Sequence, residues 1–160
     1  MQDREQQSVA GWKPAASASY WINRASRVLI RMQDARLKAY GFGMGQMPVL
    51  HALAGGDSLS QKDLAAFARV EQPTMAEMLS RMERDGVVER SPNPQDGRGS
   101  LTSLTRRARD RFPKAQAELV EAEKQATAGL SKAEKEQLVA LLQRVAENLE
   151  AAQAKVLKPR

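Results

Sequence analysis

The chain of 160 residues has the length of one domain, or of one domain with extended arms. It contains no cysteine, which excludes a disulfide framework, a thiolate zinc site, an iron–sulfur cluster and a cysteine-based redox sensor. Because His51 is the only histidine, a multi-histidine metal site within one chain is also excluded, and we expect neither metal nor cofactor. No apolar run reaches the length of a membrane span and residues 1–7 are polar, so we expect no membrane partner, no signal peptide and a cytoplasmic location.

Basic residues outnumber acidic ones and are concentrated in one segment. The 25 Lys and Arg residues against 19 Asp and Glu residues give a net charge of +6. Residues 90–111 contain six arginines but only Asp96 and Asp110, a local net charge of +4. A solvated surface of mixed charge accounts for the overall excess equally well, but a concentrated stripe of arginines favours phosphate binding.

The first part of the chain is predicted to be an arm followed by two helices. Residues 1–16 lack hydrophobic periodicity, which indicates an extended arm. Over residues 19–40 apolar side chains recur at spacings of three and four, which predicts a helix that Gly41 ends as a left-handed cap. A short helix through residues 49–53 follows, with Pro48 near its start, where a proline does least harm.

Two short helices separated by a three-residue break come next. Ser60 and Asp63 form a capping-box-like pair that opens a helix ending at Ala68. After residues 69–71, a strict i, i+3, i+4, i+7 apolar stripe predicts a helix over residues 73–85. The stripe, which we assign to the core, consists of Met75, Met78, Leu79 and Met82.

The periodicity then changes to that of strands before it becomes helical again. Residues 87–90 and 99–105 are predicted strands, joined by a polar hairpin tip over residues 91–98. Thr105 can cap a long helix whose apolar heptad seam is Ala108, Phe112, Ala115, Leu119, Ala122 and Ala126. A capping box from Ser131 to Glu134 opens a last helix. Its apolar positions are Leu138, Leu141, Leu142, Val145, Leu149, Ala152 and Val156.

This layout predicts a mainly α fold that contains a helix-turn-helix with a wing. In such a motif the second short helix lies in the major groove of DNA. With the apolar stripe inward, helix 73–85 presents short hydrogen-bonding groups at its start and arginines further along, which suits base edges and then phosphates. These outward residues are Gln72, Pro73, Thr74, Glu77, Ser80, Arg81 and Arg84. An ordinary polar helix face is the alternative interpretation.

The stretch from Tyr40 to Thr105 resembles the MarR family of bacterial transcriptional regulators. Residues 40–50 are similar to the beginning of the family's second helix, residues 59–65 to its third, and residues 73–88 to its recognition helix and first wing strand. Asp96-Gly97-Arg98, with Leu104-Thr105 five residues on, matches the family's wing motif D-x-R-x5-L-T. All these pieces occur in order and at the family's spacing.

The resemblance implies a homodimer in which the N-terminal helix and the last two helices of each chain intertwine beside two winged lobes. It divides the chain into an arm (1–16) and one domain (17–160), with dimerisation helices at 17–40 and 105–160 and a DNA-binding lobe at 44–104. The heptad seams of the last two helices also favour a partner, since such stripes rarely stay exposed. Twofold symmetry then predicts a palindromic operator with half-sites about one helical turn apart.

Carried over by position, Arg98 enters the minor groove from the wing tip and Asp96 orients it. Their alternative roles are a solvated loop charge and a turn-former. The expected DNA-binding residues are Ser60, Gln61, Gln72, Pro73, Thr74, Glu77, Ser80, Arg81, Arg84, Arg90, Asp96 and Arg98. The chain departs from the family at Gly97, where a second arginine is often found, and at Gly43, where Thr or Ser often caps the second helix.

Family members are often released from DNA by small aromatic acids bound between the dimer helices and the lobe, so the resemblance implies such an effector. Five residues lie in the two helices expected to wall the pocket: Tyr20, Trp21, Arg24, Tyr40 and His51. Arg24 could pair with a carboxylate while an aromatic side chain stacks on the ligand. Alternatively, Tyr20 and Trp21 belong to a dimer core and His51 is a satisfied polar group.

The sequence therefore predicts a sequence-specific DNA-binding regulator that acts as a ligand-responsive repressor. An enzyme is disfavoured, because no glycine-rich phosphate loop follows a strand, no G-x-S-x-G occurs, and one histidine provides little acid–base chemistry. We assign no catalytic residue. The alternative is a helical protein-interaction module with a vestigial wing, which the glycine at position 97 and three acidic residues near the recognition helix (Glu71, Glu77 and Glu83) would favour.

Overall fold

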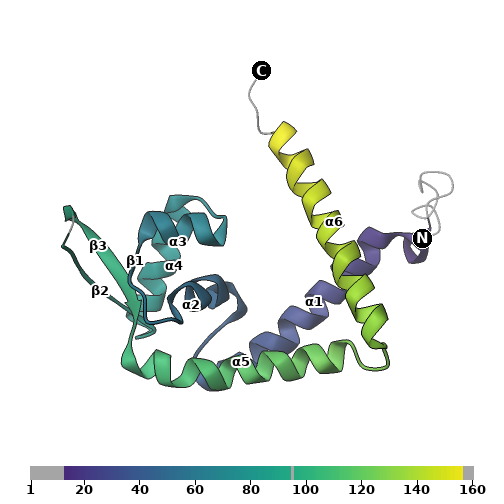
Figure 1. The fold of residues 1–160 in the computed structure, drawn as a ribbon, viewed down its shortest axis with the longest axis horizontal. Coiled ribbons are helices and arrows are strands. Elements are labelled where there is room, and N and C mark those ends of the chain that lie inside the picture. Colours follow the sequence, from purple (N-terminus) through teal and green to yellow (C-terminus); the bar gives the residue numbers. More distant parts are fainter. Residues whose placement is uncertain (1–12, 95, 157–160) are drawn as a thin grey trace, which may run out of the picture. The chain divides into compact units, whose positions relative to one another are not determined.

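Figure 1 shows a computed structural model of the chain, which describes residues 13–94 and 96–156. Contacts within the chain divide it into two compact units, one up to Ala122 and one from Glu123 onward. The predicted arm lies outside the described residues except for its last part, where Pro14–Ala16 form a turn of 3-10 helix. Among the described helices, none has the length and apolar character needed to cross a membrane.

The first predicted helix is present as α1 (Ala18–Leu37), which continues into a 3-10 turn over Lys38–Tyr40. Gly41 ends it with a φ of +80°. This left-handed conformation costs glycine little, since glycine has no Cβ to clash with the backbone. The predicted left-handed cap is therefore confirmed.

The second helix begins without a capping side chain of its own. Gly43 precedes a short 3-10 turn that leads into α2 (Met47–Leu53). Asp34 of α1 supplies the missing acceptor, because its Oδ1 accepts a hydrogen bond from the backbone N–H of Met44 at 2.6 Å. Pro48 lies in the first turn of α2, where its missing N–H costs no helix hydrogen bond, so its predicted place is confirmed.

The two short predicted helices are confirmed as α3 (Gln61–Ala68) and α4 (Gln72–Arg84). The predicted cap is present, because Oγ of Ser60 accepts a hydrogen bond from the backbone N–H of Asp63 at 3.2 Å. Arg69 ends α3 with a φ of 54°, the one left-handed residue other than glycine in the described part of the chain. The apolar stripe of α4 faces the core, where Met75, Leu79 and Met82 are buried and Met78 is partly buried.

The wing belongs to a three-stranded antiparallel sheet with the order β1-β3-β2. The predicted hairpin is present as β2 (Val88–Asn93) and β3 (Asp96–Leu104), but both strands run further toward the tip than predicted. The predicted polar tip over residues 91–98 is too long, because Pro92 pairs with Ser100 in the ladder. Since β2 is an edge strand, it tolerates this proline.

The third strand, β1 (Leu59–Ser60), is not predicted, because two residues are too few to show alternation. Leu59 pairs with Thr102 and Ser60 with Leu101, both in β3. The residue that caps α3 is therefore also hydrogen-bonded into the sheet of the wing.

The first half of α5 (Arg106–Ala126) completes the core of the first unit. Its seam residues Ala108, Phe112 and Ala115 are buried there, and Phe112 meets Phe42 edge to face with ring centroids 6.2 Å apart. The expectation that this part of the seam needs a partner chain is wrong, because the helix starts on the winged lobe and covers the core of that lobe.

The second unit contains α6 (Lys132–Val156), which begins at the predicted capping box. Oγ of Ser131 accepts the backbone N–H of Glu134 at 3.3 Å, and the Glu134 carboxylate accepts the backbone N–H of Ser131 at 2.8 Å. The hydrogen bonds from Ser131 lower the pKa of Glu134 below its ordinary value. Unlike the first half of α5, α6 leaves much of its apolar seam exposed within the chain: Leu138, Leu141, Leu142 and Leu149.

Candidate nucleic-acid interface

The outward face of α4 carries the largest group of predicted DNA contacts. Because Met75, Leu79 and Met82 anchor one side of the helix in the core, the residues between them point to solvent. The exposed side chains are Gln72, Pro73, Thr74, Glu77, Ser80, Arg81 and Arg84. This face offers hydroxyl and amide groups near the helix start and guanidinium groups near its end, as predicted.

Arg81 is the arginine on the outer face of α4 that is available to a partner outside the chain. It is exposed and forms no ion pair with any described residue. By contrast, Nε of Arg84 lies 3.2 Å from Oδ1 of Asp85, and Nε of Arg90 lies 3.2 Å from Oε2 of Glu83. An arginine without an intramolecular partner can use all of its guanidinium N–H donors to bind a base edge or a phosphate.

Two of the predicted contact residues, Ser60 and Gln61, are only partly exposed, and their side chains form hydrogen bonds within the chain. The hydroxyl of Ser60 is engaged with Asp63 at the start of α3. Nε2 of Gln61 donates a hydrogen bond to the carbonyl oxygen of Gln72 at 3.5 Å, which links the first residues of α3 and α4. Ser60 therefore caps α3, and Gln61 helps to position α4.

The backbone of Asp96 and Arg98 lies in β3, at the end of the strand next to the wing tip. Their side chains lie outside the part of the chain that the structure describes. Arg90, on β2, faces Thr102 across the ladder, and its guanidinium pairs with Glu83 of α4. The wing is thereby tied to the recognition helix by an ion pair.

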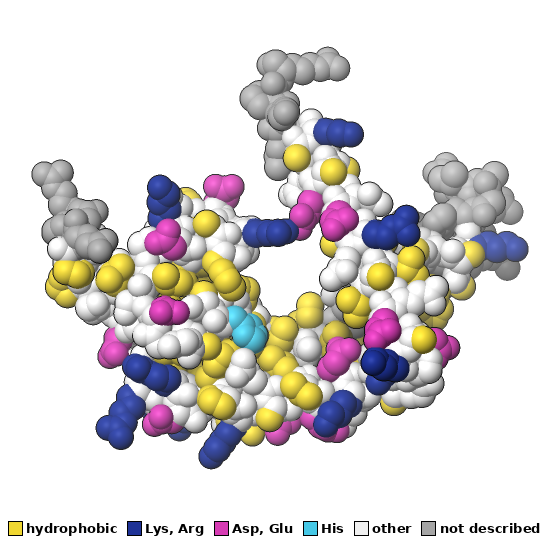
Figure 2. Space-filling view, in the orientation of Figure 1, with side chains coloured by type: hydrophobic (Ala, Val, Ile, Leu, Met, Phe, Trp, Pro, Cys, Tyr) yellow, Lys and Arg dark blue, Asp and Glu magenta, His cyan; other side chains and the backbone are white. Residues whose placement is uncertain are grey.

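Lys and Arg side chains also gather at the lower left of Figure 2, over the beginning of α5 and the base of the wing. Arg106, Arg107 and Arg109 are exposed and Arg111 is half-buried. Arg109 has a structural role, since its Nη2 donates to the carbonyl oxygen of Leu104 at 3.0 Å. The basic segment predicted from the sequence thus divides between the wing and α5.

Three of the five predicted ligand residues form a cluster near the beginning of α1. Trp21 is half exposed and meets Tyr20 edge to face at 5.3 Å. The guanidinium of Arg24 lies 5.5 Å from the centre of the Trp21 ring and donates to the Tyr20 hydroxyl at 3.3 Å. Arg24 therefore has aromatic neighbours, as predicted. Within this chain the three residues form a cluster on the surface.

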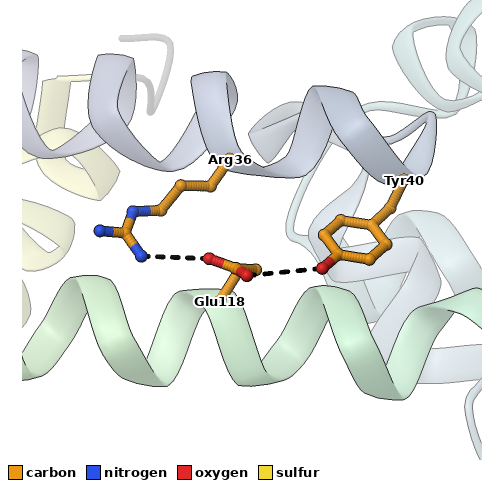
Figure 3. A network of polar contacts seen from close by, with 3 residues as sticks. All are labelled: Arg36, Tyr40 and Glu118. Carbon is orange, nitrogen blue, oxygen red and sulfur yellow. Dashed lines mark hydrogen bonds and ion pairs between the residues drawn. The ribbon is translucent and has the colours of Figure 1, made fainter.

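The other two predicted ligand residues lie elsewhere. Tyr40 follows Tyr20 by twenty residues of helix, a separation of about 30 Å at 1.5 Å per residue. Its hydroxyl donates to Glu118 at 3.4 Å, and Glu118 also accepts from Arg36 at 3.1 Å (Figure 3). His51 is exposed on α2 and meets Phe112 edge to face at 5.3 Å. A single chain does not bring the five residues together.

Sequence reasoning missed the link between Arg36, Tyr40 and Glu118, which fastens the end of α1 to α5. No local pattern announces a contact between residues 82 positions apart. It also missed Arg69, because a left-handed arginine carries no signal in the way that a glycine does.

Two short helices joined by a tight turn, an antiparallel hairpin after them, and a polar outer face on the second helix define a winged helix-turn-helix protein. The comparisons with known proteins agree. The model of the MarR family matches residues 43–100. The homoprotocatechuate degradative operon repressor of Escherichia coli is 32% identical over 107 residues, which are 67% of this chain and 72% of that protein.

Solved structures share the fold. The crystal structure of a probable transcriptional regulator from Pseudomonas aeruginosa matches with a TM-score of 0.73 and 25% identity, over 83% of this chain and 99% of that one. A mutant MarR from Escherichia coli, crystallised in complex with operator DNA, matches with a TM-score of 0.71 and 24% identity, over 79% and 91% of the two chains. The chain belongs to the MarR family of transcriptional regulators. The alternative of a helical interaction module gains no support from these relatives.

Proposed function

We propose that the protein is a homodimeric repressor that binds a palindromic operator and is released by a small aromatic acid. The observation that carries the DNA-binding part is the outer face of α4, where Arg81 is exposed without an intramolecular partner. In this proposal α4 lies in the major groove, with Thr74, Glu77, Ser80 and Arg81 near base edges and Arg84 near phosphates. Arg98 enters the minor groove from the wing. Such a repressor works in the cytoplasm, where the bacterial chromosome lies.

We propose that the chain has a DNA-binding part and a dimerisation part. Residues 44–104 serve as the DNA-binding lobe, while residues 17–40 and 105–160 serve as the dimerisation helices. The exposed leucines of α6 support a partner chain, because a row of four large apolar side chains in water is costly. The mutant MarR crystallised with operator DNA supports the DNA-binding role.

The proposed effector is a small aromatic acid that binds where a dimer assembles residues of both chains. Two observations support it. The E. coli relative is a homoprotocatechuate degradative operon repressor, and Arg24 forms a cluster with Tyr20 and Trp21. Tyr40 and His51 do not join this cluster within one chain. The proposed pocket therefore either includes residues of a second chain or uses only some of the five predicted ligand residues.

Footprinting of the DNA upstream of the protein's own coding sequence tests the proposal, because regulators of this kind often control their own expression. We expect a protected segment with twofold symmetry and half-sites about one helical turn apart. Random duplex of equal length is the control, and it should bind more weakly and with a strong dependence on salt. Equal binding to both duplexes at all salt concentrations would contradict the proposal.

A further inference from the structure

A cavity of about 120 Å³ lies on the first unit. Three segments line it: Tyr40–Phe42 at the turn after α1, Asp85–Val87 between α4 and β2, and α5 with Arg107, Ala108 and Arg111. The lining therefore contains two guanidinium groups, both on α5, and one carboxylate, that of Asp85.

The charges around this cavity are unbalanced. Arg107 and Arg111 are four residues apart on α5, so their side chains lie on the same face and repel each other. Neither forms a hydrogen bond or ion pair with any described residue. The one acidic residue in the lining, Asp85, is already paired with Arg84 at 3.2 Å.

The position of these arginines in the helix adds to the imbalance. Partial positive charge from the backbone N–H groups accumulates at the N-terminus of a helix, so cations there are unfavourable. The first turn of α5 has no acidic residue, and Arg106 and Arg107 open the helix. A bound anion would reduce the repulsion between Arg107 and Arg111 and would offset the unfavourable position of Arg107 in the first turn.

We propose that this cavity binds a small oxyanion, a carboxylate or phosphate group held between Arg107 and Arg111. Guanidinium groups match such oxyanions in charge and in hydrogen-bond geometry. The cavity has room for a small anionic group. Arg111 is half-buried beside Gly41, where a Cβ would lie 3.8 Å from its Nη1. The guanidinium of Arg111 therefore lies next to the Gly41 turn, which also lines the cavity.

Anion binding at this cavity requires neither the proposed operator nor a second chain. The anion would bridge α5 to the turns that end α1 and α4, so it should stabilise the winged lobe as a whole. Binding to the folded chain alone raises the free energy of unfolding in proportion to the logarithm of the anion concentration above its Kd.

The test is a titration of the full-length protein with sodium phosphate and, separately, with sodium benzoate, at constant ionic strength set by sodium chloride. Thermal unfolding and isothermal calorimetry are the two readouts. We expect saturable binding of one of these anions or both, and the pair of titrations shows whether the site takes a phosphate or a carboxylate. No saturable effect beyond chloride with either anion would overturn the proposal.

Three variants locate the site. Arg107→Gln and Arg111→Gln should each weaken anion binding by about tenfold or more, because each removes a charge-assisted hydrogen bond. Arg106→Gln is the matched control, since Arg106 is exposed on the same turn but does not line the cavity, and it should bind the anion as the unaltered protein does. Arg107 is also exposed, so Arg107→Gln should fold normally even if Arg111→Gln does not. Equal losses in all three variants, or loss of duplex DNA affinity in place of anion affinity, would overturn the assignment.

Discussion

The hydroxyl of Thr105 donates a hydrogen bond to the carbonyl oxygen of Gly86 at 2.8 Å, which joins the residue after the second wing strand to the turn before the first. Oγ1 of Thr105 also accepts a hydrogen bond from the backbone N–H of Ala108 at 3.2 Å and so caps α5. One side chain thus closes the base of the wing and starts the helix that covers the core.

Replacing Thr105 with valine should lower the free energy of unfolding by about 1–2 kcal/mol, because the helix loses its cap and the Gly86 carbonyl loses a donor. Chemical denaturation followed by circular dichroism measures the change. Thr105→Ser, which keeps the hydroxyl, is the control and should retain most of the stability. If valine and serine have the same effect, the hydroxyl is not what matters.

The exposed seam of α6 predicts that Leu142→Glu shifts the protein from dimer to monomer, or causes it to aggregate, because a charge cannot be buried cheaply in an apolar interface. Gln143→Glu introduces the same charge on another face of α6 and should leave the dimer intact. Analytical ultracentrifugation distinguishes the species. If the Leu142→Glu protein remains a stable dimer, the exposed leucines of α6 do not form the dimer interface.

Arg81→Ala should weaken operator binding by about 1–3 kcal/mol, if the arginine contacts a guanine in the major groove, and have a much smaller effect on random duplex. Arg31→Ala, at an exposed position of α1, serves as the control for the removal of one positive charge. Fluorescence anisotropy on both duplexes gives the two affinities. Equal losses on both would indicate a phosphate contact.

Arg98→Ala should weaken binding to the operator and to random duplex together and should lower the salt dependence of binding by about one counterion. The reason is that a wing arginine acts through charge and groove shape, and Gly97 offers no neighbouring arginine to replace it. Affinities at several salt concentrations provide the slope. An unchanged slope and affinity would argue against the assigned role of the wing.

Ser131→Ala should raise the pKa of Glu134 toward its ordinary value, because the hydrogen bonds from Ser131 are what lower it. A carboxylate with a lowered pKa in the folded chain adds stability above the pKa of the unfolded chain, and this stability is lost as the pH falls through the folded value. Nuclear magnetic resonance titration of the Glu134 carboxyl carbon measures the shift. A Glu134 titration that is the same in Ser131→Ala and in the unaltered protein would contradict this cause of the shift.

Local signals made the helices predictable. Capping residues such as Ser60 and Ser131 place the beginning of a helix within a residue or two, because the hydrogen bonds that they make are confined to one turn. Gly41 marks an end for the same reason. The outer face of α4 followed directly from its apolar stripe.

Features that depend on distant residues could not be predicted. The cap that Asp34 gives to Met44 comes from another helix, and the partner of Arg36 lies on α5. The apolar seam of α5 looked like a surface for a second chain, since periodicity identifies an apolar face but not what covers it. The cavity near Arg107 is likewise assembled from three segments that no single window of sequence contains.

The pairing of Leu59 and Ser60 with β3 has a mechanical consequence. A displacement of the hairpin is passed through two ladder rungs to the first residue of α3, and through the Arg90–Glu83 ion pair to the last turns of α4. The recognition helix and the wing are therefore linked both through β1 and through this ion pair. We expect an effector that displaces α4 on DNA to displace the wing as well, so that both contacts weaken together.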